Sequence, residues 1–226
     1  MKNRSQINFT KINIGCGYDK KDDYINVDIN ADCHPDILIS NNDDSEILRN
    51  HYELVYARDV LEHIYREKTL ETLLNWSDYL KIGGEVELQT SDIVGIIDLI
   101  KTDTSWNNHY GMTICMFGNQ TIDGDFHYTR FTHKTLQVFM IAAGFEIIDM
   151  HTKDGWLLNC RAQKVQDWTN HNPEDDIVKF AFQSALGRLP EDFHYTIYKD
   201  YLAKDILKSI WSSPERLVKV ARDLSL

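Results

Sequence analysis

Hydrophobic and polar positions follow strand and helix periods through about residue 165 of the chain. Short apolar runs predict strands at residues 11–14, 24–29, 35–39 and 53–57, and residues 85–89 alternate with the period of two typical of a half-buried strand. Leu70, Leu73, Leu74 and Leu80 recur at helical spacing, and we expect the Gly83-Gly84 pair to end that helix. Strand and helix signals thus take turns along this part of the chain.

The end of this region predicts a helix followed by a hairpin. Thr132 suits the N-cap of a helix that Gly144 ends. Two further strands, at residues 145–150 and 156–162, are joined by Asp154-Gly155, which is a hairpin signal. We therefore expect an α/β fold: a Rossmann-like, mostly parallel sheet with helices on its faces and a terminal antiparallel hairpin.

The character of the chain changes after Lys164. Residues 166–173 are polar and suit a linker, and no strand signal follows them. The segments Asn172-Pro173-Glu174 and Ser213-Pro214-Glu215 each read as a helix start with proline in the first turn. Apolar residues recur on helix faces after both starts: Ile177, Phe180, Ala181 and Ser184, then Ile206, Leu207, Ile210 and Trp211, then Leu217, Val220 and Leu224. We predict a main domain at residues 1–165 and a small helical domain at residues 172–226.

Composition excludes several classes of function. The chain has 226 residues, 42% of them hydrophobic, and a formal net charge of −11. An acidic surface without a basic run argues against nucleic-acid binding. The longest apolar windows are too short to insert in a membrane, and no signal core is present at the N-terminus, so we expect a cytoplasmic protein. The scattered Cys16, Cys33, Cys115 and Cys160 indicate reduced thiols, and no spacing of residues indicates a metal site.

The stretch Lys11-Ile-Asn-Ile-Gly15-Cys16-Gly17 is the strongest functional signal. A strand runs into a Gly-x-Gly turn, where a ligand can approach the backbone closely, and Asp28 ends the next strand, where such folds hold a ribose diol. A dinucleotide fingerprint needs a third glycine and an acid about 20 residues on, but Lys20 stands at the third position and Asp28 comes much earlier. The link is too short for a phosphate-binding helix, so the turn favours an adenosine cofactor without phosphates. An ordinary strand-turn-strand remains the alternative.

Three other places carry functional side chains after predicted strands. Asp59 and Glu62 follow the strand at residues 53–57, although Glu62 also suits a helix start. Asp92 follows the strand at residues 85–89 and is either a catalytic group or a helix cap. The long loop at residues 117–132 carries His127, which can act as a general base near neutral pH or can simply pin the loop.

Together these residues resemble class I S-adenosylmethionine-dependent methyltransferases. The matching stretches are Asn13-Ile-Gly-Cys-Gly, Tyr24-Ile-Asn-Val-Asp-Ile, Val60-Leu-Glu-His-Ile, Leu80-Lys-Ile-Gly-Gly-Glu, and His127-Tyr-Thr-Arg-Phe-Thr with Ala143-Gly-Phe. The subgroup most similar is compact and linked to bacterial polysaccharide biosynthesis. The resemblance implies that S-adenosyl-L-methionine lies beside Gly15, Cys16 and Gly17, that Asp28 holds its ribose, and that Asp59 borders its methionine end. Ser40 and Asn41 stand where the family often carries an Asp for the adenine amino group.

On the acceptor side we expect His127 as the base, with Asp92 in reserve, and His63, Gln120, Tyr128 and Arg130 as contacts to the substrate. The expected reaction is methyl transfer to a hydroxyl of a sugar or surface glycan. Methylation of a nitrogen or of another small molecule, served by Asp59, Glu62 and Asp92, stays open, as does a weakly active scaffold. The tail, with Ala185-Leu-Gly-Arg188-Leu-Pro190, is similar to a helical domain of unknown function found in envelope-glycan proteins, which implies other glycan-biosynthesis proteins as partners.

Overall fold

A seven-stranded sheet forms the centre of the computed structural model, which describes residues 9–40, 43–121, 124–168, 175–213 and 215–216. Its order is β3-β2-β1-β4-β5-β7-β6. Neighbouring strands from β3 to β5 pair parallel, whereas β7 pairs antiparallel with both β5 and β6. The strands are β1 (Lys11–Ile14), β2 (Ile25–Asp28), β3 (Ile37–Leu38), β4 (Tyr52–Arg58), β5 (Leu80–Ser91), β6 (Phe145–Lys153) and β7 (Leu157–Lys164). The predicted α/β fold with a terminal hairpin is confirmed.

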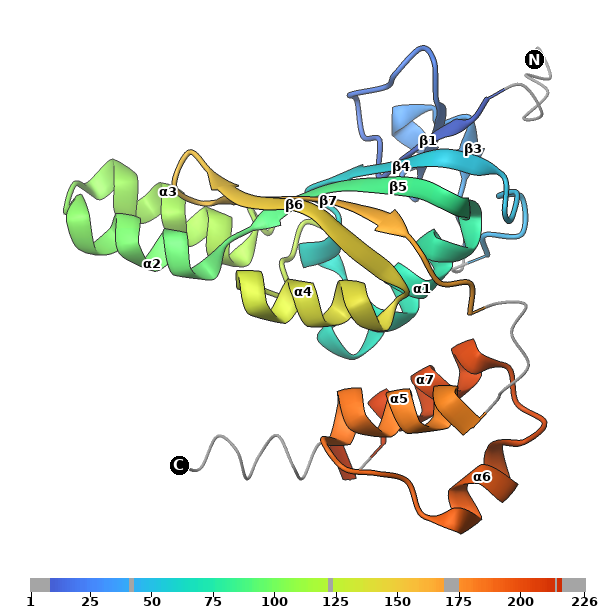
Figure 1. The fold of residues 1–226 in the computed structure, drawn as a ribbon. Helices are drawn as coiled ribbons and strands as arrows, with labels where there is room; N and C mark the ends of the chain where they lie inside the picture. The colour runs from blue at the N-terminus through green and yellow to red at the C-terminus, as the bar shows by residue number, and fades with distance from the viewer. Residues whose placement is uncertain (1–8, 41–42, 122–123, 169–174, 214, 217–226) are drawn as a thin grey trace.

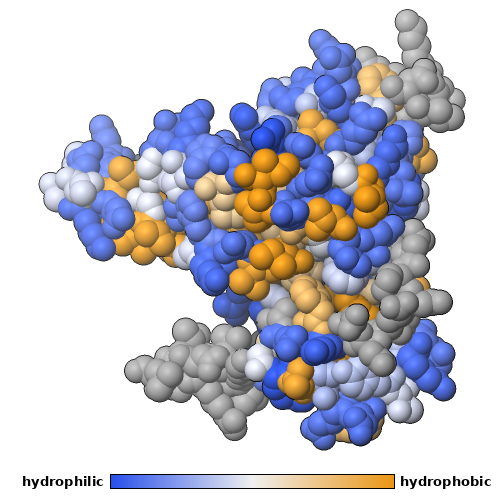
Figure 2. Space-filling model, in the orientation of Figure 1, coloured by the Kyte–Doolittle hydropathy of each residue, from blue (hydrophilic) through white to orange (hydrophobic). Residues whose placement is uncertain are grey.

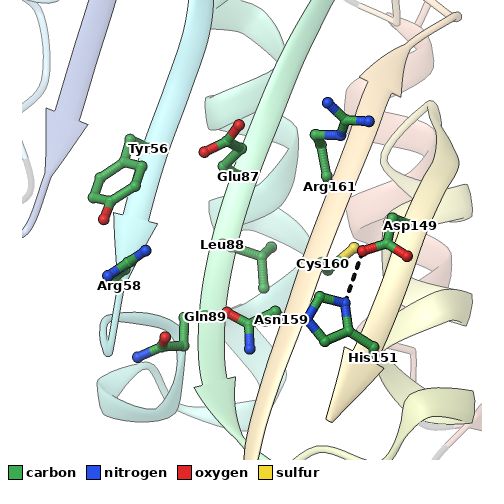
Figure 3. Close-up of a pocket in the computed structure, with 10 residues that line it drawn as sticks. All are labelled: Tyr56, Arg58, Glu87, Leu88, Gln89, Asp149, His151, Asn159, Cys160 and Arg161. Atoms are coloured by element: carbon green, nitrogen blue, oxygen red, sulfur yellow. Dashed lines mark hydrogen bonds and ion pairs between the residues drawn. The ribbon is translucent and has the colours of Figure 1, made fainter. Parts of the chain in front are cut away.

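The described helices lie unevenly about this sheet. Helices α1 (Thr69–Tyr79) and α4 (His133–Ala142) cover one face, and α2 (Ile93–Thr102) and α3 (Trp106–Phe117) project from it as an arm (Figure 1). No labelled helix lies over the opposite face in Figure 1, and the helices drawn in Figure 3 lie behind the strands. Residues 15–24, all described, link β1 to β2 through turns alone. The parallel edge therefore carries the glycine turn without a helix behind it.

Local sequence signals account for most element ends. Thr132 caps α4 and forms a reciprocal capping box with Thr135. The hairpin turn has positive φ at both Asp154 and Gly155, as a type I′ turn requires at its two central residues. The prediction for Gly83-Gly84 is wrong, because α1 ends at Tyr79 and both glycines lie within β5. The pairing of β4 with β5 shifts register between Tyr52 and Leu54, and this irregularity accommodates the extra residues.

Alternation along the strands builds the core on the helix-covered face. Val55, Val86 and Ala162 are each fully buried and lie on neighbouring strands at paired positions. Leu73 and Leu74 of α1 and Leu136 and Met140 of α4 pack on this layer. Burial of aliphatic side chains like these is the main stabilising term for such a domain, at about 1.5–3 kcal/mol for each one fully buried.

The helical tail packs against α1 and α4, the helices that cover the core face of the sheet. It consists of α5 (Asp175–Leu186), α6 (Asp192–Tyr198) and α7 (Ala203–Trp211) in the described part of the chain. Trp211 lies against Phe139 of α4 with ring centroids 5.3 Å apart, and Lys208 Nζ lies 3.0 Å from Glu71 Oε1 of α1. The predicted apolar face Ile206, Leu207, Ile210 and Trp211 is buried. The Asn172-Pro173-Glu174 start and the face at Leu217, Val220 and Leu224 fall outside the described residues.

We expect Trp211→Ala to destabilise the tail and the sheet domain together. Trp211 is 6% exposed and belongs to the cluster that contains the sheet core, and truncation of a buried aromatic costs about 3–5 kcal/mol. Thermal denaturation followed by circular dichroism should give one transition at a lower temperature. Two separate transitions would show that the tail unfolds on its own.

The visible surface is largely polar. In the view of Figure 2 it is mostly hydrophilic, with separate hydrophobic patches, one of them on the α2–α3 arm. Val94 and Trp106 of that arm are 51% and 76% exposed. Among the described residues, no helix has the length and apolar character needed to cross a membrane.

Candidate active site

The glycine turn leaves the carboxyl end of β1 with two residues in the left-handed region. Gly15 has φ of 62° and Gly17 has φ of 48°. A Cβ on Gly15 would lie 2.5 Å from Cγ2 of Val60, which follows β4, whereas a Cβ on Gly17 would meet nothing within 4 Å. Gly15 is thus needed for packing, and Gly17 opens onto free space beside the backbone, where a ligand can approach.

Asp28 lies at the carboxyl end of β2 and faces this turn. Its Oδ2 accepts the Gly17 N–H at 2.7 Å, and its Oδ1 accepts the Asn30 N–H at 2.8 Å. A carboxylate has about four lone-pair sites, so each oxygen keeps capacity for one more donor, and the side chain is half-buried. The group is held in place by the backbone and can still accept from two ribose hydroxyls.

Cys16 lies between the two glycines and is 4% exposed. Burial, and then the nearby Asp28 charge, raise the pKa of its thiol to about 11. The side chain is therefore an uncharged thiol at neutral pH. It can line a site by contact but lacks the thiolate that a nucleophile needs.

Ser40 and Asp59 complete the parallel edge. The Ile39 N–H donates to the Asp28 carbonyl at 2.9 Å, so the exposed Ser40 follows directly beyond Asp28, while Asn41 lies outside the described residues. Asp59 is exposed and has φ of 52°, a strained conformation for a residue with a side chain. Gln89 Nε2 holds its carboxylate at 3.2 Å. All predicted cofactor residues that are described thus follow carboxyl ends of adjacent parallel strands.

Two histidines from distant segments meet beyond the end of β4. His63 belongs to the short 3₁₀ segment Leu61–His63, and His127 to the loop before α4. Their rings pack edge to face with centroids 4.5 Å apart. The loop is fixed there because the N–H groups of Tyr128 and Thr129 donate to the Glu62 carbonyl, at 2.8 and 3.1 Å. Since Val60 packs on Gly15, the histidine pair and the glycine turn lie at the same edge.

His127 has the protonation state of a base. Its Nδ1 lies 3.0 Å from the Cys115 carbonyl oxygen, which can only accept, so Nδ1 carries the proton and Nε2 keeps a free lone pair. Burial, with the charges of Arg130 and His63, lowers the pKa of this imidazole below its ordinary 6.5. His127 is therefore neutral at pH 7. The carbonyl partner was missed by sequence analysis because helix α3, which presents it, was not predicted.

Tyr128 extends the site with an exposed aromatic surface. It stacks on Tyr65 with centroids 4.2 Å apart, and Phe126 stacks on Tyr128 with centroids 6.2 Å apart. Tyr128 and Tyr65 are 45% and 54% exposed. Gln120 instead donates to the Phe117 carbonyl at 3.2 Å and stays exposed, which pins the loop. Tyr128 directly follows His127 in the chain, so the aromatic stack lies next to the histidine pair.

Asp92 takes the capping role that was the alternative to its use as a base. Its Oδ1 accepts the Val94 N–H at 3.0 Å at the start of α2, and its Oδ2 accepts the Thr152 hydroxyl at 2.6 Å. It is 4% exposed. It lines a separate cavity of about 500 Å³ together with His133 and Thr152. Each carboxylate oxygen has one donor, and the cavity that Asp92 lines contains neither His63 nor His127.

Glu62, which is buried, and Arg130, which is partly buried, lie near enough for their charges to interact, a proximity that the sequence did not reveal. Glu62 is 1% exposed, accepts the Thr90 hydroxyl at 2.9 Å, and has its pKa raised by burial to about 7. Arg130 Nη1 donates to the Thr129 carbonyl, but Nε and Nη2 are buried and find no partner among the described residues. No group of three or more potential metal ligands occurs in the described part of the chain.

A second cavity, of about 220 Å³, lies on the uncovered face of the sheet. Polar side chains line it, including Tyr56, Glu87 and Arg161 on adjacent strands (Figure 3). None of the predicted site residues lines it, although Gln89, which does, also holds Asp59. This cavity is distinct from the edge that carries the glycine turn.

No protein-family model matches the chain, and no curated protein matches it. Solved structures do. A 1,6-didemethyltoxoflavin-N1-methyltransferase from Burkholderia thailandensis is 12% identical, with a TM-score of 0.45, and the match covers 69% of this chain and 71% of that one. S-adenosylmethionine-dependent methyltransferases from Methanosarcina mazei and Mesorhizobium loti are 15% and 14% identical, each with a TM-score of 0.48. They match 69% of this chain and 92% and 91% of theirs. With TM-scores below 0.5, these likenesses carry no argument about the reaction.

Gly15→Ala and Gly17→Ala should have different effects. Both place a side chain at positive φ, which costs about 1–2 kcal/mol, but only the Gly15 methyl collides with Val60, and overpacking adds about 1–3 kcal/mol. We expect Gly15→Ala to lower the melting temperature more, and Gly17→Ala to weaken cofactor binding in a folded protein. Differential scanning fluorimetry with and without S-adenosylhomocysteine measures both. Equal melting temperatures would contradict the packing role of Gly15.

Proposed function

We propose that this chain is an S-adenosyl-L-methionine-dependent methyltransferase that acts on a hydroxyl of a sugar or surface glycan. The observation that carries the proposal is the neutral His127, with Nε2 free, at the same edge of the sheet as the glycine turn. Gly15 packs on Val60, and Val60 directly precedes the segment Leu61–His63, which holds the histidine pair. Cofactor and acceptor positions would thus be neighbours.

The residues present fit the cofactor. Gly17 would leave room for it, Asp28 would hold its ribose hydroxyls, and Asp59 would border its methionine end, where an exposed carboxylate favours the α-amino group. Ser40 is exposed near Asp28 and can accept a hydrogen bond from the adenine amino group. The sulfonium of the bound cofactor would supply a reactive methyl group, so the chain's own task is orientation and proton removal.

His127 would remove the proton. An alcohol oxygen is a poor nucleophile while it keeps its proton, and a base at Nε2 takes that proton as the oxygen–carbon bond forms. Helix α3 orients the ring through the Cys115 carbonyl, and His63 supports its edge. Since His127 is already neutral at pH 7, no prior deprotonation is needed.

The aromatic surface supports a sugar as the acceptor. The C–H face of a pyranose packs on exposed aromatic rings, whose negative faces attract it, and Tyr65 and Tyr128 offer such rings beside the histidine pair. Methylation of an amine is less well supported. Of its three candidate carboxylates, Glu62 is 1% exposed and Asp92 is 4% exposed, which leaves Asp59 as the exposed one.

Incubation with methyl-labelled S-adenosylmethionine and a panel of glycans and amines, read by mass spectrometry, tests the proposal. We expect the label in a methyl ether of a sugar. A methylamine product would show that the acceptor is an amine and not a sugar hydroxyl. A panel in which no acceptor gains label, although the cofactor binds, would remove the sugar hydroxyl from the proposal.

A further inference from the structure

Arg130 has an unpaired cationic edge inside the proposed active site. Within the described part of the chain, only Nη1 of its guanidinium has a hydrogen-bond partner, the carbonyl of Thr129. Nε and Nη2 are buried, and no described residue lies within hydrogen-bond reach of them. Buried charged donors are almost always paired, because leaving one unpaired costs more than the bond itself contributes. Arginine cannot relieve this cost by losing its proton.

Glu62 does not complete the pair. Its charge acts on Arg130, but the two side chains form no ion pair within 4 Å, and Glu62 is already held by the Thr90 hydroxyl. Cys115, the other neighbour that acts on Arg130, carries an uncharged thiol because burial raises its pKa. No nearby anion in the described part of the chain therefore satisfies the Nε–Nη2 edge.

The geometry of that edge points to one class of ligand. Nε–H and Nη2–H of a guanidinium point in parallel and match the two oxygens of a carboxylate, which gives the strongest side-chain hydrogen bonds in proteins. Arg130 follows Tyr128 of the aromatic stack and His127 in the same loop. We propose that Arg130 binds the carboxylate of a bound molecule. The identity of that molecule rests on the proposed function.

Two molecules can bring such a carboxylate. One is a carboxylated acceptor, such as a uronic acid, and the position of Arg130 beside the aromatic stack favours it. The other is the methionine part of the cofactor. In either case the side chain turns toward the ligand by breaking a single hydrogen bond to Thr129, because Arg130 is only partly buried and its other donors are free.

Calorimetric binding to the full chain tests the proposal and separates the two sources. Glucuronate is compared with glucose, and S-adenosylhomocysteine with 5′-methylthioadenosine, which lacks the carboxylate. The variants are Arg130→Gln, Arg130→Lys, which keeps the charge but loses the fork, and Arg161→Gln as a matched control on the open sheet face. We expect Arg130→Gln to lower the affinity for one of the two carboxylated ligands by about 10- to 100-fold. The affinity for the matching ligand without a carboxylate should stay within about twofold of the wild-type value. Arg130→Lys should give an affinity between those of the wild type and Arg130→Gln.

A loss of affinity for glucuronate alone assigns the carboxylate to the acceptor. A loss of affinity for S-adenosylhomocysteine alone assigns it to the cofactor. Equal loss for a carboxylated ligand and its partner would overturn the proposal, because it indicates a structural role. No loss for either pair would also overturn it, because a buried water then satisfies the donors. If the wild-type chain fails to bind S-adenosylhomocysteine, the proposed function fails, and the glucuronate comparison without cofactor still decides the role of Arg130.

Discussion

Replacing His127 with alanine should lower turnover by about 10²–10⁴-fold, the range expected for loss of a general base, while leaving cofactor affinity unchanged. The effect is large because the imidazole is oriented through Nδ1 by the Cys115 carbonyl and is kept neutral by its surroundings. Asp92, which was expected in reserve, caps α2 and lines a separate cavity, so we do not expect it to replace His127. Single-turnover rates at saturating acceptor, with calorimetric titration of S-adenosylhomocysteine, measure the two quantities separately.

The pH profile gives an independent check on the same residue. Because the surroundings of His127 lower its pKa below 6.5, the rate should rise with pH through a value below 6.5 and be flat around neutrality. The alanine variant should lose this acid limb. His109→Ala is the matched control, since His109 is exposed on the projecting arm, where its Nε2 lies 3.1 Å from the Ile100 carbonyl oxygen. Unchanged turnover in His127→Ala would remove the residue from the role of base.

Replacing Asp28 with asparagine should weaken cofactor binding by about 10- to 100-fold. A hydrogen bond to a charged acceptor contributes about 1.5–3 kcal/mol, and the asparagine side chain keeps one oxygen while its amide cannot accept from a hydroxyl. The change should also affect the turn, because Asp28 accepts the Gly17 and Asn30 N–H groups. Isothermal titration with S-adenosylhomocysteine measures the loss.

Asp32→Asn is the control for this substitution. Asp32 is exposed and lies in the short segment after β2. Its replacement by asparagine removes the same charge close to the site. Its affinity for S-adenosylhomocysteine should match that of the wild type. An unchanged affinity in Asp28→Asn, with the fold intact by circular dichroism, would contradict the assignment of Asp28 to the ribose.

Local patterns predicted the frame of the molecule well. The Gly15–Gly17 turn, the Asp92 and Thr132 helix caps and the Asp154-Gly155 hairpin all depend on neighbouring residues, and the structure has each of them. The Gly83-Gly84 prediction failed because strand pairing with β4 overrode the local preference of glycine for a helix end. Tertiary pairing regularly overrides propensity in this way.

The site itself depends on contacts that local patterns do not contain. His63 and His127 meet because the loop N–H groups of Tyr128 and Thr129 reach back to the Glu62 carbonyl. The burial of Glu62 and the unpaired edge of Arg130 arise from the same long-range docking. The sequence therefore indicated candidate residues for the site, but not which of them are neighbours or which protonation state each one has.

Titration of the full chain with S-adenosylhomocysteine, NAD and 5′-methylthioadenosine in one calorimetric series tests the central claim most directly. The short turn from Gly17 to Asp28, without a phosphate-binding helix, predicts binding of S-adenosylhomocysteine and 5′-methylthioadenosine, with NAD much weaker or absent. Gly17→Ala and Asp28→Asn should lower the affinities for S-adenosylhomocysteine and 5′-methylthioadenosine. Failure to bind S-adenosylhomocysteine at millimolar concentration, or preference for NAD, would contradict the account.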